Sequence, residues 1–139
     1  MQTKEKGNVI DQIGSILVMA FIFVMLLAFA AYGRMTQVRL EYNNIAKEYL
    51  YLMEQNGYLR AEDKTLLVDD FANAKANVVI EPDTTEVQQT YGDKVTLHLT
   101  VTFQNPLYTV FSTDGAMFNI FGFNPDLVYE IKKTTTTKW

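Results

Sequence analysis

The sequence predicts an α+β fold: a long N-terminal helix that is transmembrane in its first half and amphipathic in its second, then a short helix and a small antiparallel β-sheet. Three observations lead to this prediction. Residues 12–33 carry no charge, residues 38–52 place apolar side chains at helical spacing, and residues 95–103 alternate between apolar and polar. The 139 residues divide accordingly into a short charged N-terminal segment (1–11), a transmembrane helix half (12–33), an amphipathic helix half (34–57) and a head domain (58–139).

The nearly all-apolar residues 13–31 are predicted to be a retained membrane anchor, because a helix of this length crosses a hydrocarbon core of ~30 Å. Two other interpretations were weighed against it. In the first, the stretch is a secretory signal cleaved after Ala30, where Ala28-Phe29-Ala30 fits the small-x-small pattern. In the second, it is a buried core helix. The run exceeds the usual apolar region of a signal, and an all-apolar core helix belongs to larger proteins, so the anchor is favoured.

The charges that flank the anchor leave its orientation open. Two basic residues, Lys4 and Lys6, precede it, and three, Arg34, Arg39 and Lys47, follow it. The positive-inside rule therefore leans slightly against a cytoplasmic N-terminus, by a single basic residue. Charge alone does not fix the topology.

Beyond Gly33 an apolar stripe continues the helix. The residues of the stripe alternate spacings of four and three, which places them on one helical face. They are Val38, Tyr42, Ile45, Tyr49 and Leu52. No Pro interrupts the run, and Asn56-Gly57 supplies a left-handed residue that ends helices. We predict one nearly continuous helix from Gln12 to about Gln55, with a break at Tyr32-Gly33 as the alternative.

The remaining residues are predicted to form the head. Residues 60–74 carry an apolar stripe with acidic residues in the first turn, which indicates a second helix. The alternating run 95–103 is the clearest strand, with one face buried and one solvated. Weaker strand candidates are residues 78–80, 86–90 and 127–132. We expect the sheet to pack on the amphipathic half of the long helix.

Composition excludes several classes of protein. With no Cys and one His, the chain has neither a disulfide framework nor a thiolate or multi-histidine metal centre. Its net charge of −4 lies wholly on residues 34–139, because two basic and two acidic residues cancel before them, and this argues against binding nucleic acid. No phosphate-binding loop, nucleophile elbow or metalloprotease motif occurs. We expect no enzyme activity, no cofactor, no metal and no small-molecule substrate.

Two candidate contact sites have simple interpretations. His98 lies on the Thr face of its strand without a catalytic partner beside it, so it is interpreted as a solvated surface residue. The Glu81-Pro82-Asp83 turn is likewise interpreted as solvated charge, since it does not resemble a calcium loop. The aromatic-rich residues 116–123 either fold over the core or form an apolar contact with a partner or membrane. The candidate contact residues there are Phe118, Ile120, Phe121 and Phe123.

Four features of the chain occur together. A short charged N-terminus ends at Gly7, Asp11 stands just before an uninterrupted apolar helix, an amphipathic helix ends in Tyr-Leu-Met-Glu-Gln-Asn-Gly at residues 51–57, and a sheet strand follows at 95–103. This combination resembles the TadE-like pilins and pseudopilins of the type IV pilin-like superfamily, most closely those of Gram-positive bacteria. The resemblance covers most of residues 6–57 and only the general style of the rest.

The resemblance implies a processing site and a topology. A dedicated peptidase would cut after Gly7, so the mature chain would begin at Asn8. The family carries a Glu at the fifth mature position, whereas this chain has Gln12 there and the acid Asp11 at the fourth. The resemblance also implies a single pass through the cell membrane, with a cytoplasmic N-terminus and an extracytoplasmic head.

Two functions are therefore considered. The first is a structural pilin-like subunit that joins copies of itself or other pilin-like subunits in, or at the base of, a surface filament, through mutual burial of apolar helix faces. Its candidate assembly residues are Asp11, Val38, Tyr42, Ile45 and Tyr49. The alternative is a non-polymerising, membrane-anchored binding module of an envelope, secretion or conjugation complex, which would use the aromatic-rich segment.

Overall fold

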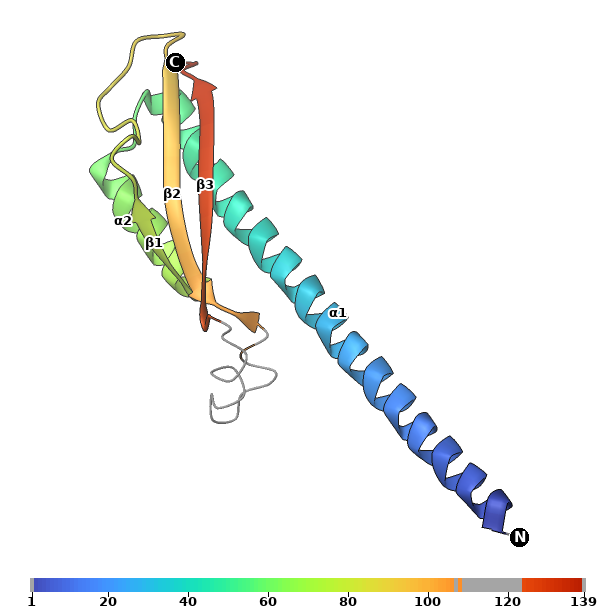
Figure 1. The fold of residues 1–139 in the computed structure, drawn as a ribbon. Helices are drawn as coiled ribbons and strands as arrows, with labels where there is room; N and C mark the ends of the chain where they lie inside the picture. The colour runs from blue at the N-terminus through green and yellow to red at the C-terminus, as the bar shows by residue number, and fades with distance from the viewer. Residues whose placement is uncertain (1, 107, 109–123, 139) are drawn as a thin grey trace.

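The computed structural model of the protein describes residues 2–106, 108 and 124–138, with side chains described from Gly7 onward. Its elements are α1 (Gln2–Asn56), α2 (Ala61–Asn73), β1 (Ala76–Ile80), β2 (Lys94–Gln104) and β3 (Asp126–Thr136). Figure 1 shows a small head at one end of a long helix, whose N-terminal half projects away from it. The α+β prediction and its order of elements are confirmed.

α1 is a single unbroken helix of 55 residues, ~83 Å long at 1.5 Å per residue. It continues through Tyr32-Gly33, so the predicted continuity is confirmed. It begins at Gln2, earlier than the predicted start at Gln12, because residues 2–11 contain no helix-breaking proline and several good helix formers. It ends at Asn56, within one residue of the prediction. The next residue, Gly57, has a φ of 80°, and its N–H donates to the Met53 carbonyl at 2.8 Å.

The three strands form one antiparallel sheet in the order β1-β2-β3. β2 is central: its residues 99–103 pair with β1, from Ile80↔Leu99 to Ala76↔Phe103. Its whole length pairs with β3, from Lys94↔Thr136 to Gln104↔Asp126. The strands predicted at 78–80, 95–103 and 127–132 are confirmed, and each extends beyond its predicted bounds.

The strand predicted at residues 86–90 is wrong. These residues belong to the irregular connection between β1 and β2. The Gln89 N–H donates to the Gly57 carbonyl at 3.1 Å, and the Gln89 side chain donates to the Val87 carbonyl at 2.8 Å. Glu86 also forms an ion pair with Lys64 of α2. The segment therefore bonds to the helices and the turn between them, and it pairs with none of the three described strands.

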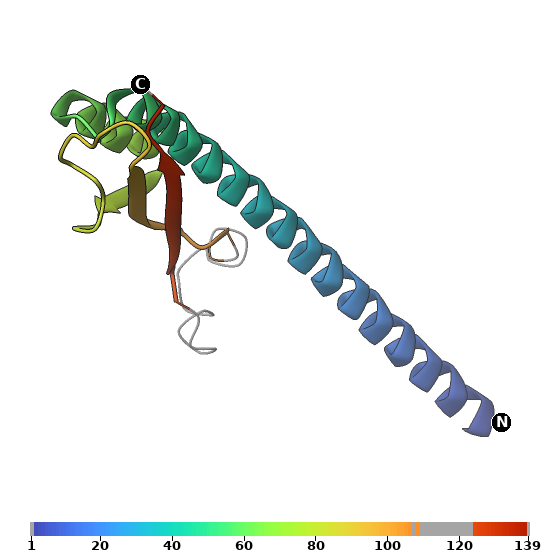
Figure 2. The ribbon, with the colours of Figure 1, turned by 90° about the horizontal axis from the view of Figure 1, so that it is seen from above.

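Both helices cover the same face of the sheet (Figure 2). α1 packs on β2 and β3, and α2 packs on β1. The inward side chains of β2, such as Leu97 and Leu99, are fully buried. They meet a cluster of aromatic rings, in which Tyr42 lies 5.6 Å from Phe71 and 5.3 Å from Phe103, centroid to centroid. The predicted packing of the sheet on the amphipathic half of the helix is confirmed.

The C-terminal residues of the head bind to the C-terminal end of α1. The Lys138 N–H donates to the Glu54 carbonyl at 2.9 Å, and the Lys138 ammonium lies 3.2 Å from the Glu54 carboxylate. The Thr135 hydroxyl donates to the same carboxylate. The hydrogen bond from Thr135, followed by the one from Lys138, lowers the pKa of Glu54. The head is therefore bound to the second half of α1 both through the core and through Glu54 near the C-terminal end of the helix.

Candidate membrane anchor and assembly surface

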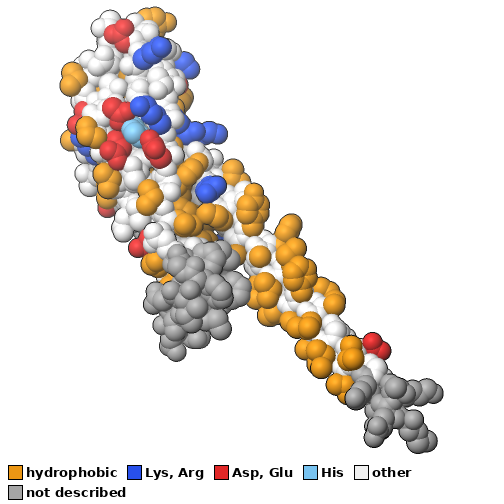
Figure 3. Space-filling model, in the orientation of Figure 1, with side chains coloured by type: hydrophobic (Ala, Val, Ile, Leu, Met, Phe, Trp, Pro, Cys, Tyr) orange, Lys and Arg blue, Asp and Glu red, His pale blue; other side chains and the backbone are white. Residues whose placement is uncertain are grey.

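The uncharged residues 12–33 form a largely exposed apolar surface on α1, in which Ala31 is buried and Leu27 is partly buried. At 1.5 Å per residue they span ~33 Å, close to the thickness of a hydrocarbon core. Twelve of their large apolar side chains are more than half exposed: Ile13, Ile16, Leu17, Val18, Met19, Phe21, Ile22, Phe23, Val24, Met25, Leu26 and Phe29. Figure 3 shows this apolar surface along the visible side of α1 below the head. By length and composition the helix could cross a membrane.

The interpretation of this stretch as a buried core helix is wrong. The most apolar window of the helix is 0% buried, and the head contacts α1 mainly in its second half. An exposed apolar surface of this size is unfavourable in water. Burial of this surface in lipid or against another apolar surface would remove that cost.

The predicted stripe on the second half of α1 faces the head. Tyr42 and Tyr49 are only 2% and 4% exposed, and Val38 and Ile45 are partly buried against the same core. These four residues therefore hold the head on α1. The single chain already covers Tyr42 and Tyr49, whereas Val38 and Ile45 keep part of their surface exposed. The expected role of the stripe in contacts between subunits stays a prediction.

The two buried tyrosines also bond the helices through their hydroxyls. The Tyr49 hydroxyl donates to the Asp70 carboxylate of α2 at 2.5 Å, and the Tyr42 hydroxyl donates to the Ala74 carbonyl at 3.4 Å. Burial raises the pKa of both hydroxyls, and the Asp70 hydrogen bond raises that of Tyr49 further. Both tyrosines stay neutral donors at physiological pH.

An outward apolar line on α1 was not predicted. Leu40 and Tyr51 are each 59% exposed, Phe29 is 79% exposed and Val18 is 58% exposed. Successive members are eleven residues apart, and eleven residues fall within about 20° of three full helical turns. The four side chains therefore lie along one side of α1, from the uncharged residues to the level of the head. The periodicity that predicted the buried stripe did not reveal them, because they are too widely spaced.

The predicted processing and assembly residues near the N-terminus lie inside α1. Gly7 and Asn8 are exposed, and so is Asp11. Asp11 stands at the end of the uncharged residues, and no described side chain bonds to it. The predicted contact residues Phe118, Ile120, Phe121 and Phe123 lie outside the described residues.

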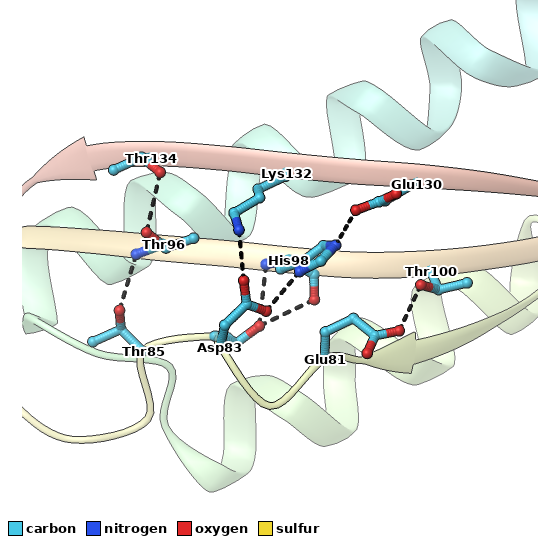
Figure 4. Close-up of polar contacts among 10 residues, drawn as sticks. Glu81, Asp83, Thr85, Thr96, His98, Thr100, Glu130, Lys132 and Thr134 are labelled. Atoms are coloured by element: carbon cyan, nitrogen blue, oxygen red, sulfur yellow. Dashed lines mark hydrogen bonds and ion pairs between the residues drawn. The ribbon is translucent and has the colours of Figure 1, made fainter.

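A charged cluster occupies the face of the sheet opposite the helices (Figure 4). At its centre the His98 ring of β2 makes two short contacts. Its Nδ1 lies 2.6 Å from the Asp83 carboxylate, and its Nε2 lies 2.5 Å from the Glu130 carboxylate of β3. The Lys132 ammonium donates to the other Asp83 oxygen at 2.7 Å. His98 lies on the solvent-facing side of the sheet, as predicted, but its ring is paired with two carboxylates and its side chain is only 16% exposed.

The electrostatics of the cluster follow from these contacts. The hydrogen bond with Lys132, followed by the one with His98, lowers the pKa of Asp83. The hydrogen bond with Asp83 raises the pKa of Lys132. The cluster is a network of paired charges, and no group of three acidic or histidine side chains among the described residues has the arrangement of a metal site.

Comparisons with protein-family models, with curated proteins and with solved structures found no match to this chain. The apolar anchor, the outward line on α1 and the charged cluster are the features from which a function is inferred.

Sequence reasoning missed the charged cluster because its members come from three separate segments. The alternation in β2 placed His98 on the solvated face, but not beside any acid. The register of the sheet, which pairs His98 with Lys132, brings β3 to it. The Asp83 turn is held beside it by hydrogen bonds from Glu81 and Thr84 to the His98 carbonyl. An alternating pattern recognised through the whole of 126–136 would have placed Glu130 and Lys132 on the same side of their strand.

Proposed function

We propose that this chain is a structural, pilin-like subunit that assembles into, or at the base of, a surface filament. In this proposal α1 anchors it in the cell membrane with its N-terminus cytoplasmic and its head outside. One observation carries the proposal: a single helix of 55 residues is uncovered and apolar in one half, and bears the head on the other.

The physical argument concerns what covers the apolar half. In a bilayer, lipid tails surround it at little cost. On leaving the bilayer each large side chain would lose ~1.5–3 kcal/mol of burial unless an equivalent surface replaced the lipid. Packing the same helix faces of several subunits together supplies that surface. Assembly by mutual helix burial therefore needs no chemistry beyond what α1 carries.

The outward line Val18, Phe29, Leu40 and Tyr51 supports contacts that continue beyond the membrane. Two of its members lie in the uncharged residues and two lie beside the head. A neighbouring helix laid along this line would contact both levels at once. The buried stripe on the head side of α1 would meanwhile keep each head in place.

The direct test is to look for the chain in filaments. We expect sheared surface fractions, viewed by electron microscopy and analysed by mass spectrometry, to contain this chain in filaments whose subunits begin at Asn8. The variant Leu40→Glu with Tyr51→Glu is expected to lower filament yield at least several-fold. Its matched control is Leu66→Glu with Tyr91→Glu. These residues are also exposed, at 55% and 70%, but they belong to α2 and to the connection between β1 and β2 and not to the outward line.

A chain found only in membranes, bound to other envelope proteins, would contradict the filament proposal. It would favour the alternative of a non-polymerising binding module. Equal filament yield from both double variants would show that the outward line on α1 is not a contact.

A second prediction concerns Asp11. A carboxylate at the edge of the hydrocarbon is costly unless it reaches water, headgroups or a cation. In a filament the natural partner is the α-amino group of a neighbour, or the neighbour's Lys6 where the chain is not cleaved after Gly7. Asp11→Ala is therefore expected to leave membrane insertion intact and to lower filament yield. Asp11→Glu, which keeps the charge, serves as the control. Undiminished yield from Asp11→Ala would exclude this role.

A further inference from the structure

His98 joins two segments that lie on either side of β2. One is the connection of residues 81–93 between β1 and β2, through Asp83, and the other is β3, through Glu130. Figure 4 shows the imidazole between the two carboxylates. The two helices lie on the opposite face of the sheet (Figure 2), so they bring no charge to this cluster.

The hydrogen-bond chemistry fixes the state of the ring. An ionised carboxylate only accepts hydrogen bonds, and a neutral imidazole has only one N–H to donate. Both contacts of His98 are satisfied together only when both ring nitrogens carry a proton. Lys132 holds Asp83 in its ionised form from the other side, and Glu81 instead accepts a hydrogen bond from Thr100 at 2.6 Å.

The charge balance of the cluster gives the same result. With His98 protonated, two cations face the carboxylates of Asp83 and Glu130, and the four charges cancel. With His98 neutral, Lys132 alone faces two carboxylates. One ring nitrogen of His98 then has no proton to donate. Its lone pair faces a carboxylate oxygen, and the two repel each other.

We propose that protonated His98 is a clasp that fastens the 81–93 connection to β3 across β2, and that deprotonation opens it. The segment it holds is structurally important. Next to Asp83, the Thr84 hydroxyl donates to the His98 carbonyl at 3.0 Å, and the following Thr85 carbonyl accepts from the Leu59 N–H at 2.9 Å. The clasp therefore steadies the place where the turn between the helices meets the sheet.

The direction of the pH dependence follows from the contacts. The hydrogen bond with Asp83, followed by the one with Glu130, raises the pKa of His98 above its usual 6.5. A group whose pKa is higher in the folded state adds stability that is complete below the unfolded value. That stability is lost as the pH rises through the folded value. The head is thus expected to be firmer under mildly acidic conditions and looser under alkaline ones.

The first test uses the fact that the chain has one His, so its imidazole NMR signal is unambiguous. The full chain in detergent micelles is titrated. We expect a midpoint above 6.5, which falls toward that value in Asp83→Asn and in Glu130→Gln. Asp126→Asn, an exposed carboxylate at the far end of β3, is the matched control and leaves the midpoint unchanged. A midpoint at or below 6.5 in the parent overturns the proposal.

The second test measures the stability that the clasp adds. The melting temperature of the head is compared between the parent and His98→Gln at about pH 5.5, and again one unit above the titration midpoint. At the lower pH we expect the parent to have a higher melting temperature than His98→Gln. At the higher pH we expect the two melting temperatures to be equal. A difference of equal size at both would show that His98 only packs, and would overturn the clasp. If His98→Gln does not fold, Asp83→Asn replaces it. Neither measurement involves filaments, so both are independent of the proposed function.

Discussion

Replacing Phe71 with Ala is expected to lower the free energy of unfolding of the head by about 3–5 kcal/mol, because it opens a cavity in a closed core. Phe71 is 0% exposed. Its ring lies against Tyr42 of α1, 5.6 Å from centroid to centroid, so it connects α2 with the long helix. The loss is measured by urea unfolding of the full chain in detergent micelles, followed by near-ultraviolet circular dichroism.

The same substitution at Phe29 is the matched control. Phe29 is 79% exposed, and it lies in the apolar half of α1, away from the core. Phe29→Ala is therefore expected to leave the unfolding of the head unchanged. Similar losses in the two variants would mean that the head has no core of its own.

The double variant Ile22→Asp with Leu26→Asp is expected to abolish membrane integration. Residues 13–31 contain eleven Leu, Ile, Phe and Val residues, which together favour insertion by roughly 3–7 kcal/mol. Each Asp near the helix centre costs about 2.5–3.5 kcal/mol. Two of them therefore remove the whole preference, whereas one would leave it close to balance. The measurement is the fraction of protein that stays in membranes after extraction with alkaline carbonate.

The control places the same two charges outside the uncharged residues, as Leu40→Asp with Asn44→Asp. These positions are also exposed and four residues apart on α1. Acidic residues contribute little to orientation, so the control tests depth alone and is expected to integrate fully. Full integration of Ile22→Asp with Leu26→Asp would contradict the assignment of residues 12–33 to the membrane.

The elements that sequence could predict are those whose signals are local. The absence of Pro through residue 56 and the left-handed Gly57 predicted the length and end of α1. The alternation of β2 predicted both its position and its buried face. The helix start was predicted too late because charge was taken as a boundary, although Lys, Glu and Gln are good helix formers.

What could not be predicted depends on contacts between distant segments. Residues 86–90 have strand-like composition, yet the Gln89 N–H donates to the Gly57 carbonyl and none of these residues joins the sheet. The stripe containing Tyr42 and Tyr49 predicted that one face of the helix would be buried. Periodicity does not show whether the residues that bury this face come from the same chain or from another. The contacts of His98 could be predicted only from the register of β2 with β3, and no local sequence pattern gives that register.

The continuity of α1 from Gln2 to Asn56 has a mechanical consequence. No break in the helix separates the uncharged residues 12–33 from the residues that carry the head. The length of α1 therefore sets both the distance of the head from the uncharged residues and its rotation about the helix axis. Residues 34–56 set the height of the upper end of the head at ~35 Å above the last uncharged residue. Each residue added or removed between Arg34 and Val38 would turn the head by about 100° about the helix axis while moving it only ~1.5 Å. The number of residues between the uncharged residues 12–33 and the core of the head therefore determines the direction in which the head faces.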